Sequence, residues 1–204
     1  TEEAFRTIID AHLQHGATSF FPTLSSSPFS KLHQATEICE QLMKEPGSPV
    51  MGLHIEGPYL NPTMAGEQFS GMVKAVDENE YKELIENSHC IRRWDASPEL
   101  PGALDFARYL KKKGILVALS HTEAEYDGIK SAYEAGFTHA AHFYNAMPGF
   151  HKRREYKYEG TVESVYLTDD MTIELIADGI HLPATILRLA YKLKGVEPVS
   201  YTHL

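Results

Sequence analysis

Side chains that can bind a metal ion stand at the ends of three separate apolar stretches of the chain. Glu56 ends one stretch, just before a glycine and a proline, and His121 and His142 each end a later one. One carboxylate oxygen and two imidazole nitrogens suit zinc or another divalent first-row metal and leave a position open for water. Each residue taken singly is more simply an ordinary polar residue. Three coincident placements at strand ends favour a metal site.

Apolar stretches closed by chain breakers predict the strands of a parallel sheet, which are apolar almost throughout. The strand candidates are residues 18–21, 50–56, 91–96, 114–121, 137–142 and 171–179. The segments between them are long enough for helices, which we expect near residues 1–15, 28–43, 77–87, 99–113, 122–135 and 183–194. Strands joined by such crossovers run in parallel, so the sequence predicts an α/β fold.

An open doubly wound sheet and a closed (β/α)8 barrel both fit this order of elements. The polar residues favour the barrel, because barrel enzymes gather their site from the carboxyl ends of several strands. Here those ends carry Glu56, His121, His142 and Asp178. Only about six of the eight strands of such a barrel are recognisable.

Composition limits the classes of protein and partner. The chain has 204 residues, of which 43% are hydrophobic, enough for one domain with a substantial core. A net charge of −9 without a large basic cluster excludes nucleic acid as the expected partner. No apolar run reaches the ~18 residues of a membrane span. The two cysteines, Cys39 and Cys90, form no CxxC motif, so we expect a reducing, cytoplasmic location.

Four motifs resemble those of a known family. They are Gly-Leu-His-Ile-Glu-Gly-Pro-Tyr-Leu-Asn-Pro at 52–62, Leu-Ser-His-Thr at 119–122, His-Phe-Tyr-Asn-Ala-Met at 142–147 and Ile-Ala-Asp-Gly-Ile-His at 176–181. In this order they resemble the N-acetylglucosamine-6-phosphate deacetylases of the amidohydrolase superfamily, over nearly the whole chain. The resemblance implies a metal-dependent hydrolase with a (β/α)8 TIM-type barrel, usually flanked by a small β-sandwich. It also implies hydrolysis of N-acetylglucosamine 6-phosphate to glucosamine 6-phosphate and acetate.

The resemblance assigns roles to individual residues. Its metal ligands fall on Glu56, His121 and His142, the three residues already singled out, with one zinc or iron ion between them. Its substrate contacts fall on Glu67, through the backbone, and on Asn145, Ala146 and His181. Gln68 stands where many relatives have histidine, and it would have to donate an N–H to the amide oxygen as a neutral group.

The phosphate ligand is left open between two arginines. The family has an Arg-Glu pair beyond the second metal histidine, and Arg153 has the more usual spacing whereas Arg154 directly precedes the glutamate. Either guanidinium can bind phosphate with two hydrogen bonds. The alternative is that this basic run is a solvated loop. In the family this arginine reaches a neighbouring subunit's site, so the resemblance also implies a homodimer when the protein is complete.

The sequence departs from the family at both ends. The family's first strand, with its His-x-His pair, is absent, and so is the initiator methionine. The general-base aspartate of the last strand is missing too, because Thr202 is followed by histidine. We therefore expect an internal fragment with a partial barrel over residues 1–197, an atypical, non-native tail over 198–204, and no first or last strand. The chain as written is expected to be inactive.

Two other functions remain open. One is a non-catalytic module that binds a metal or a sugar phosphate. The other is an amidohydrolase acting on a cyclic amide, which would share the metal ligands but not the phosphate-binding residues. His54 is either a neighbour of the metal ligands or a packed core residue, and Asp178 is either such a neighbour or a helix cap. The remaining histidines singled out are expected at the surface: His12, His15, His33, His89 and His151.

Overall fold

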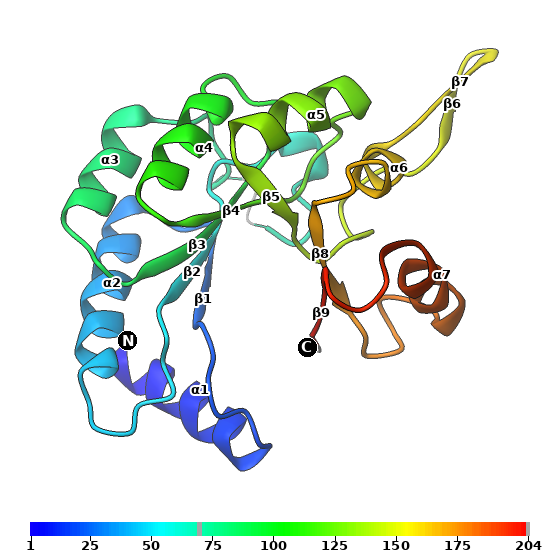
Figure 1. The fold of residues 1–204 in the computed structure, drawn as a ribbon. Coiled ribbons are helices and arrows are strands. Elements are labelled where there is room, and N and C mark those ends of the chain that lie inside the picture. The colour runs from blue at the N-terminus through cyan, green and yellow to red at the C-terminus, as the bar shows by residue number, and fades with distance from the viewer. Residues whose placement is uncertain (69–70, 203–204) are drawn as a thin grey trace.

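One curved parallel sheet with helices on its outer side makes up most of the described chain (Figure 1). The computed structural model describes residues 1–68 and 71–202. Its seven-stranded sheet has the order β1-β2-β3-β4-β5-β8-β9, and all neighbouring strands are parallel. The strands are β1 Thr23–Ser25, β2 Leu53–Glu56, β3 Ile91–Ala96, β4 Leu116–Leu119, β5 Phe137–Ala140, β8 Thr172–Ile176 and β9 Val199–Thr202. The predicted α/β fold is confirmed.

Helices alternate with these strands, as the crossovers of a parallel sheet require. They are α1 Glu2–Gln14, α2 Phe29–Met43, α3 Glu78–Glu86, α4 Ala103–Lys112, α5 Tyr126–Ala135, α6 Thr161–Tyr166 and α7 Ala184–Lys194, with a 3-10 turn at Pro62–Met64. A separate antiparallel hairpin, β6 His151–Arg153 and β7 Tyr156–Tyr158, projects away from the body (Figure 1). No helix in the described ranges has the length and apolar character needed to cross a membrane.

The two faces of β2 show how the sheet orients the polar residues. Leu53 and Ile55 are fully buried among the core residues, and their alternating neighbours His54 and Glu56 line the cavity on the sheet's concave side. Burying a leucine or isoleucine side chain contributes about 1.5–3 kcal/mol each, which strongly favours this register over one shifted by a residue. The packing of the core thus fixes the direction in which Glu56 points.

A cluster of aromatic residues supports the chain just after Glu56. Trp94 stacks on Tyr59 at a centroid distance of 5.9 Å and meets Phe106 edge to face at 5.4 Å. The Trp94 indole N–H donates to the carbonyl oxygen of Gly57 at 2.8 Å. This buried hydrogen bond ties the turn that follows Glu56 to the core of the sheet.

The first strand lies later than predicted. Sequence placed it at 18–21, but β1 is Thr23–Ser25, and Phe20 makes only an isolated bridge with Val50. The prediction followed the apolar residues. The polar Thr23 fits this strand because its side chain lines the cavity on the concave side and does not enter the apolar core. Its hydroxyl bonds the His54 ring there at 2.9 Å.

The sheet has one strand more than predicted. β9 lies in the 198–204 stretch, which was expected to be an atypical tail, and it pairs in parallel with β8 from Ile173↔Val199 to Ile176↔Thr202. The prediction that the last strand is missing is therefore wrong. Its β-branched and aromatic residues are typical of a strand, but the run is short and partly polar. The boundary at 197 stays a prediction, and His203 lies outside the described residues.

Candidate metal centre

Three strand ends bring Glu56, His121 and His142 together. Glu56 is the last residue of β2, and each histidine follows the end of its strand by two residues, after Leu119 of β4 and Ala140 of β5. One ligand atom from each lies within 4.8 Å of the others. Glu56 Oε1 is 3.0 Å from His121 Nε2 and 3.4 Å from His142 Nε2. The structure thus assembles the set of residues that the sequence predicted.

Unusual backbone conformations direct both histidines toward Glu56. The φ angles of His121 and His142 are 46° and 32°, in the left-handed region that residues other than glycine rarely adopt. Such conformations persist where surrounding contacts hold them, and they cluster at functional sites. Ser97 provides such a contact, since its hydroxyl lies 2.7 Å from the carbonyl oxygen of His121 and donates to it.

The other ring nitrogens decide which atoms face Glu56. His121 Nδ1 lies 2.8 Å from the carbonyl oxygen of Met64, and His142 Nδ1 lies 3.2 Å from that of Asn145. A carbonyl only accepts, so each Nδ1 carries a hydrogen. A neutral ring then turns its Nε2 lone pair toward the carboxylate, whereas a protonated ring donates to it, as His121 Nε2 can to Glu56 Oε1 at 3.0 Å. His142 Nε2 is buried without a hydrogen-bond partner. Lone pairs facing an anion are unfavourable unless a cation lies between them, so these residues fit a divalent metal.

The carboxyl group is held in its charged form. Burial opposes ionisation of Glu56, but the two histidine rings more than offset it and lower its pKa to about 2. Burial likewise opposes a charge on His142, yet the neighbouring Glu56 raises its pKa above the ordinary value. A proton on Nε2 satisfies Glu56 in the same way as a metal ion would. At neutral pH the site therefore offers an ionised carboxylate to whichever cation binds.

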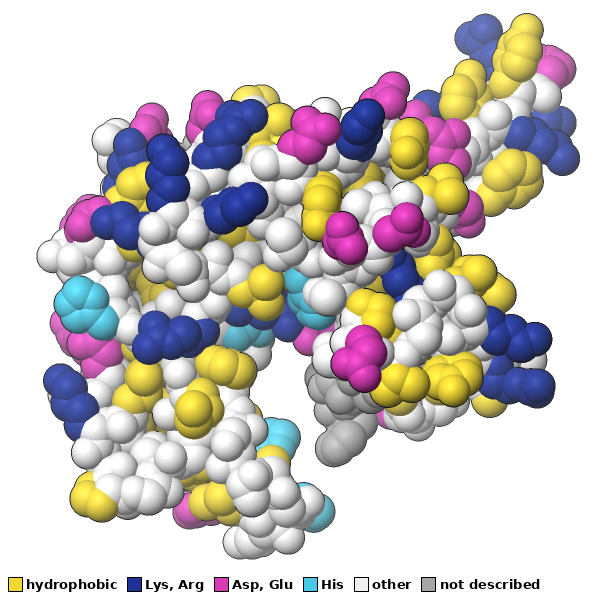
Figure 2. All heavy atoms as spheres, viewed as in Figure 1, with side chains coloured by type: hydrophobic (Ala, Val, Ile, Leu, Met, Phe, Trp, Pro, Cys, Tyr) yellow, Lys and Arg dark blue, Asp and Glu magenta, His cyan; other side chains and the backbone are white. Residues whose placement is uncertain are grey.

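The centre opens into a cavity on the concave side of the sheet. This cavity, about 690 Å³, is lined by Glu56 and His142 together with His54, Arg93, Asp95 and Glu174. In the space-filling view a hollow separates the part of the molecule that carries α1 from the part that carries α7 (Figure 2). The open side of the curved sheet thus gives access to the predicted ligands.

Sequence reasoning missed an ionic network in this cavity. Arg93 binds both oxygens of Asp95, at 2.8 and 3.0 Å, and reaches Glu174 Oε2 at 2.6 Å. Burial opposes ionisation of both acids, but Arg93, together with His54 in the case of Asp95, lowers their pKa values below the ordinary range. The signal was present in the sequence. Arg93 and Asp95 alternate along one strand, and Glu174 interrupts an otherwise apolar one.

His54 lines the cavity, and no described hydrogen bond or ion pair joins it to the three predicted ligands. Its Nδ1 bonds the hydroxyl of Thr23, and its Nε2 lies 3.0 Å from Asp95 Oδ1 at an angle that makes no hydrogen bond. Of the two roles left open for it, a packed polar residue beside Asp95 describes these contacts better than a direct neighbour of the metal ligands.

The loop after β2, which carries Gln68, runs beside the centre. A Cβ atom on Gly66 would lie 3.7 Å from His121 Cε1, so this loop runs directly beside a predicted ligand. The amide oxygen of Gln68 accepts the backbone N–H of Ser26 at 3.0 Å. Its NH₂ group is then the part of the side chain that can donate to a substrate. Glu67 is exposed.

Asn145 and Ala146 shape the turn that follows His142. Asn145 donates to the carbonyl oxygen of His142 through its backbone N–H at 2.9 Å and its side-chain amide at 3.0 Å. Ala146, at a φ of 52°, accepts from the backbone N–H of Thr122 at 3.1 Å. Asn145 thus holds the turn at His142, Ala146 joins the loops that carry the two histidines, and the contact of either residue with a substrate stays a prediction.

The predicted phosphate ligands make local contacts. Arg153 lies in the projecting hairpin, where it pairs with Glu125 and covers the ring of Tyr158 at 4.8 Å, and Arg154 occupies the turn at a φ of 55°. His151 of this hairpin is half-buried, and its ring stacks on Tyr158 at 6.1 Å. No described contact joins the two arginines to the three predicted ligands.

Asp178 organises the loop that carries His181. It accepts the backbone N–H groups of Ile180 and His181 and bonds the His181 ring at 2.7 Å, and these hydrogen bonds lower its pKa to about 2. Helix α7 begins later, with Pro183 at its N-cap. Asp178 is therefore a cap of this loop, not of a helix, and it fixes the direction of the His181 ring.

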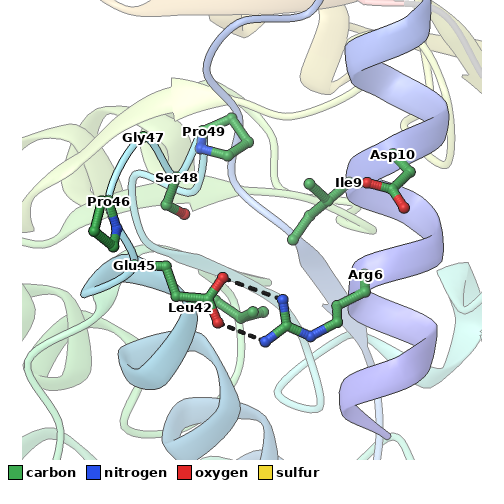
Figure 3. Close-up of a pocket in the computed structure, with 9 residues that line it drawn as sticks. All are labelled: Arg6, Ile9, Asp10, Leu42, Glu45, Pro46, Gly47, Ser48 and Pro49. Atoms are coloured by element: carbon green, nitrogen blue, oxygen red, sulfur yellow. Dashed lines mark hydrogen bonds and ion pairs between the residues drawn. The ribbon is translucent and has the colours of Figure 1, made fainter.

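A second cavity, about 220 Å³, lies between α1 and the segment that follows α2 (Figure 3). Arg6 points across it and pairs with both oxygens of Glu45, at 3.1 and 2.5 Å. Glu2 accepts from Nε at 2.9 Å. The guanidinium is paired with these two carboxylates, so this cavity describes how α1 is attached and contributes no candidate chemistry.

Curated relatives match almost the whole chain. A protein of Haemophilus influenzae named N-acetylglucosamine-6-phosphate deacetylase is 30% identical over 193 residues, 95% of this chain and 49% of the relative. A protein of Escherichia coli O157:H7 named N-acetylgalactosamine-6-phosphate deacetylase is 33% identical over 180 residues, 86% of this chain and 46% of the relative. The chain thus spans about half the length of the curated relatives it matches. No family model matches it.

Solved structures of the same kind of protein share the fold. The N-acetylglucosamine-6-phosphate deacetylase of Pasteurella multocida superposes with a TM-score of 0.84 at 29% identity, over 92% of this chain and 48% of that one. A variant of the Mycobacterium smegmatis deacetylase in complex with N-acetyl-D-glucosamine-6-phosphate gives 0.83 at 27%, with the same coverage. The predicted incomplete barrel of TIM type is confirmed. By sequence and by fold, the chain is similar to N-acetylglucosamine-6-phosphate deacetylases and spans about half of the length of these relatives.

Proposed function

We propose that the complete protein hydrolyses the acetamide of N-acetylglucosamine 6-phosphate to glucosamine 6-phosphate and acetate, with one zinc or iron ion bound by Glu56, His121 and His142. One observation carries the proposal. Ligand atoms from three separate strand ends lie within 4.8 Å of one another, and His142 Nε2 among them is buried without a hydrogen-bond partner. A divalent metal bound there supplies a Lewis acid for the amide carbonyl and makes a water nucleophilic near neutral pH.

The residues of this chain prepare the site for that chemistry. The carbonyl oxygens of Met64 and Asn145 fix which nitrogen each histidine presents, as is usual for metal-binding histidines. The NH₂ group of Gln68 donates a hydrogen bond to the amide oxygen, where negative charge develops during hydrolysis. The loop of Gln68 runs beside His121, which supports this placement.

A cationic site binds the 6-phosphate in this proposal. Arg153 or Arg154, with His181, supplies hydrogen bonds to a charged group that contribute roughly 1.5–3 kcal/mol each. Arg153 must then break its ion pair with Glu125, or its guanidinium must bind Glu125 and the phosphate at the same time. The complex known for the Mycobacterium smegmatis relative contains the same sugar phosphate, which supports this class of substrate. Because another relative is named for the galactosamine sugar, the C4 epimer is the natural control substrate.

This chain lacks the general base that the proposed reaction requires. The resemblance expects an aspartate where the sequence has His203. The described carboxylates of the cavity do not replace it, because Asp95 and Glu174 are both paired with Arg93. A positioned general base contributes about 100- to 10,000-fold in rate, so we expect the 204-residue chain to be a poor deacetylase. This feature also keeps a non-catalytic binding module as the second candidate.

A homodimer and a cytoplasmic location complete the proposal. The hairpin projects from the body with Phe150 and Tyr156 exposed to 61% and 69%, which suits a contact with a second copy (Figure 1). Cys39 and Cys90 are both free and buried, as a reducing compartment allows.

The proposal is tested by assaying acetate release with the metal-loaded 204-residue chain and with a longer version that restores the His-x-His strand and the Thr-Asp pair. We expect the longer version to prefer N-acetylglucosamine 6-phosphate over the unphosphorylated sugar in kcat/KM. Equal kcat/KM values for the two sugars would contradict the phosphate site. Metal and sugar-phosphate binding by the longer version without turnover would support the non-catalytic module, and turnover of a cyclic amide instead would support the other amidohydrolase.

A further inference from the structure

Glu174 holds the backbone of His142 from the neighbouring strand. The ladder between β5 and β8 ends at Ala140↔Ile173, two residues before the histidine. Beyond that point Glu174 of β8 accepts two hydrogen bonds from the residues that follow β5. Its Oε1 accepts the N–H of His142 at 3.3 Å, and its carbonyl oxygen accepts the N–H of Phe143 at 2.7 Å.

These hydrogen bonds act at a residue with an unfavourable backbone conformation. His142 has a φ of 32°, a strained conformation for a residue other than glycine, which needs support from its surroundings. A relaxed backbone would turn the imidazole away from Glu56, because the direction of the side chain follows from φ. Glu174 is therefore placed to fix the direction of a predicted ligand without touching its ring.

The second oxygen of Glu174 is anchored across the sheet. Oε2 accepts from Arg93 Nη1 at 2.6 Å, although β3 and β8 are separated by β4 and β5 in the sheet order. Arg93 is in turn fixed by both oxygens of Asp95, whose side chain is fully buried. Asp95, Arg93 and Glu174 thus form a chain of ionic hydrogen bonds that spans the concave side of the sheet and ends on the His142 backbone.

The other histidine is supported differently. The His121 turn is held by the hydroxyl of Ser97, a neutral group on the segment after β3. The neutral hydroxyl of Ser97 needs no counter-ion, whereas the carboxylate of Glu174 that accepts from His142 is paired with an arginine on another strand. Of these two contacts, the one at His142 is therefore the one coupled to the interior of the sheet.

We infer that Glu174, anchored by Arg93 and Asp95, is a positioning residue for the metal centre: it sets the direction of the His142 ring through the backbone N–H and thereby the affinity and geometry of the bound ion. The inference rests on the metal site of the proposed function. Outer partners of metal ligands typically change metal affinity by about 10- to 100-fold when they are removed.

The test compares Glu174→Met with the wild type in the complete protein, with Co²⁺ as the probe. Methionine approximates the size of glutamate but accepts no strong hydrogen bond. We expect the dissociation constant for Co²⁺, measured by competition with a chromophoric chelator, to rise about 10- to 100-fold. We also expect the visible absorption of the bound Co²⁺ to change, because the geometry of its ligands changes.

Glu163→Met is the matched control. Glu163 also accepts a backbone N–H, that of Gly160 at 2.9 Å, but it lies in α6 and supports no predicted ligand. It should lower the melting temperature without changing the Co²⁺ spectrum. If Glu174→Met does not fold, Glu174→Gln serves in its place, because Arg93 and the His142 N–H bond different oxygens of Glu174 and glutamine keeps an oxygen at only one of these positions. It should weaken Co²⁺ binding in the same direction by a smaller factor.

The outcomes separate this inference from the proposed function. A folded Glu174→Met protein, or in its absence Glu174→Gln, with wild-type Co²⁺ affinity and spectrum overturns the positioning role and leaves the metal site standing. A wild-type protein that binds no Co²⁺ overturns the metal site, and the positioning role falls with it. Weaker binding with an altered spectrum in the Glu174 variant alone supports the inference.

Discussion

Gln68 is the residue whose chemical role depends most on a single hydrogen bond. Its oxygen is occupied by the Ser26 N–H, so the remaining polar group is a donor. Gln68→Glu keeps an acceptor for Ser26 but has no NH₂ group to donate. We expect kcat of the active, longer version to fall about 100- to 1,000-fold, the effect of losing one donor to a developing oxyanion.

The corresponding measurement is steady-state kinetics on the sugar phosphate, with the melting temperature as a check that the Ser26 contact is kept. Wild-type kcat in Gln68→Glu would contradict the donor role. An equal loss in Gln68→Leu would agree with it.

A buried histidine makes stability depend on pH. Burial, together with a smaller effect of Arg93, lowers the pKa of His139 to about 4, although Glu174 and Asp95 partly oppose this shift. The unfolded chain takes up this proton near the ordinary value of about 6.5, so the unfolded state binds more protons below that pH. The contribution of neutral His139 to stability is therefore fully present above pH 6.5 and is lost as the pH falls from there toward 4.

We expect the free energy of unfolding to drop by as much as about 2 kcal/mol between pH 7 and pH 5. Urea denaturation at the two pH values measures this drop, and His139→Gln should remove most of it. The exposed His12 provides the control, since His12→Gln should leave the drop unchanged. A drop of the same size in His139→Gln would show that other groups cause it.

At the scale of elements, the strands that carry the predicted ligands were the easiest to predict. Continuous apolar stretches ended at Glu56, His121 and His142, and the carboxyl ends of parallel strands meet at one edge of a sheet. The left-handed turns at both histidines could not be predicted, because they depend on Ser97 and Glu174, which are distant in sequence. Tertiary contacts of this kind leave no local pattern.

Other elements could not be predicted because their sequences have no periodic apolar pattern. The hairpin β6–β7 consists of basic and aromatic residues stabilised by pairs such as Arg153 over Tyr158, so it resembled a solvated loop. Helix α6 is only six residues long, and its signal was the pair of Gly160 and Glu163 that caps it. The helix expected near residues 122–135 begins only at Tyr126, with Glu125 at its N-cap, while the Thr122 hydroxyl donates to Glu99.

The start of β2 depends on a glycine. Gly52 has a φ of 152°, and a Cβ atom there would lie 2.2 Å from Arg92 Cγ and 2.7 Å from the carbonyl oxygen of Cys90. The carbonyl belongs to the segment that pairs with β2, since it accepts the Leu53 N–H at 2.8 Å. We expect Gly52→Ala to cost more than the 1–2 kcal/mol, roughly, of left-handed strain alone, because the strands must also separate.

Gly114→Ala is the matched comparison, since Gly114 has a φ of 74° but no atom within 4 Å of the position that a Cβ methyl group would take. Thermal or urea unfolding of both variants measures the difference. Equal destabilisation of the two would mean that the contact with Cys90 contributes nothing.

At the scale of the whole molecule, β1 and β9 are the edges of the described sheet. Unpaired strand edges promote association between chains, and an open barrel exposes its interior to water. We expect the 204-residue chain to aggregate more readily and to melt at a lower temperature than a version extended at both ends. Light scattering during thermal unfolding compares them. A cooperative, monomeric melt of the short chain at the same temperature would argue against this expectation.

The central claim is that Glu56, His121 and His142 bind one divalent metal ion, and its most direct test is elemental analysis with an affinity measurement on wild type and His121→Ala. The wild type should contain one zinc or iron ion per folded chain. His121→Ala should lose it, with affinity falling by more than the roughly 100-fold that loss of an outer partner costs. A folded wild type without metal, whose affinity for added metal is the same as that of His121→Ala, would contradict the account.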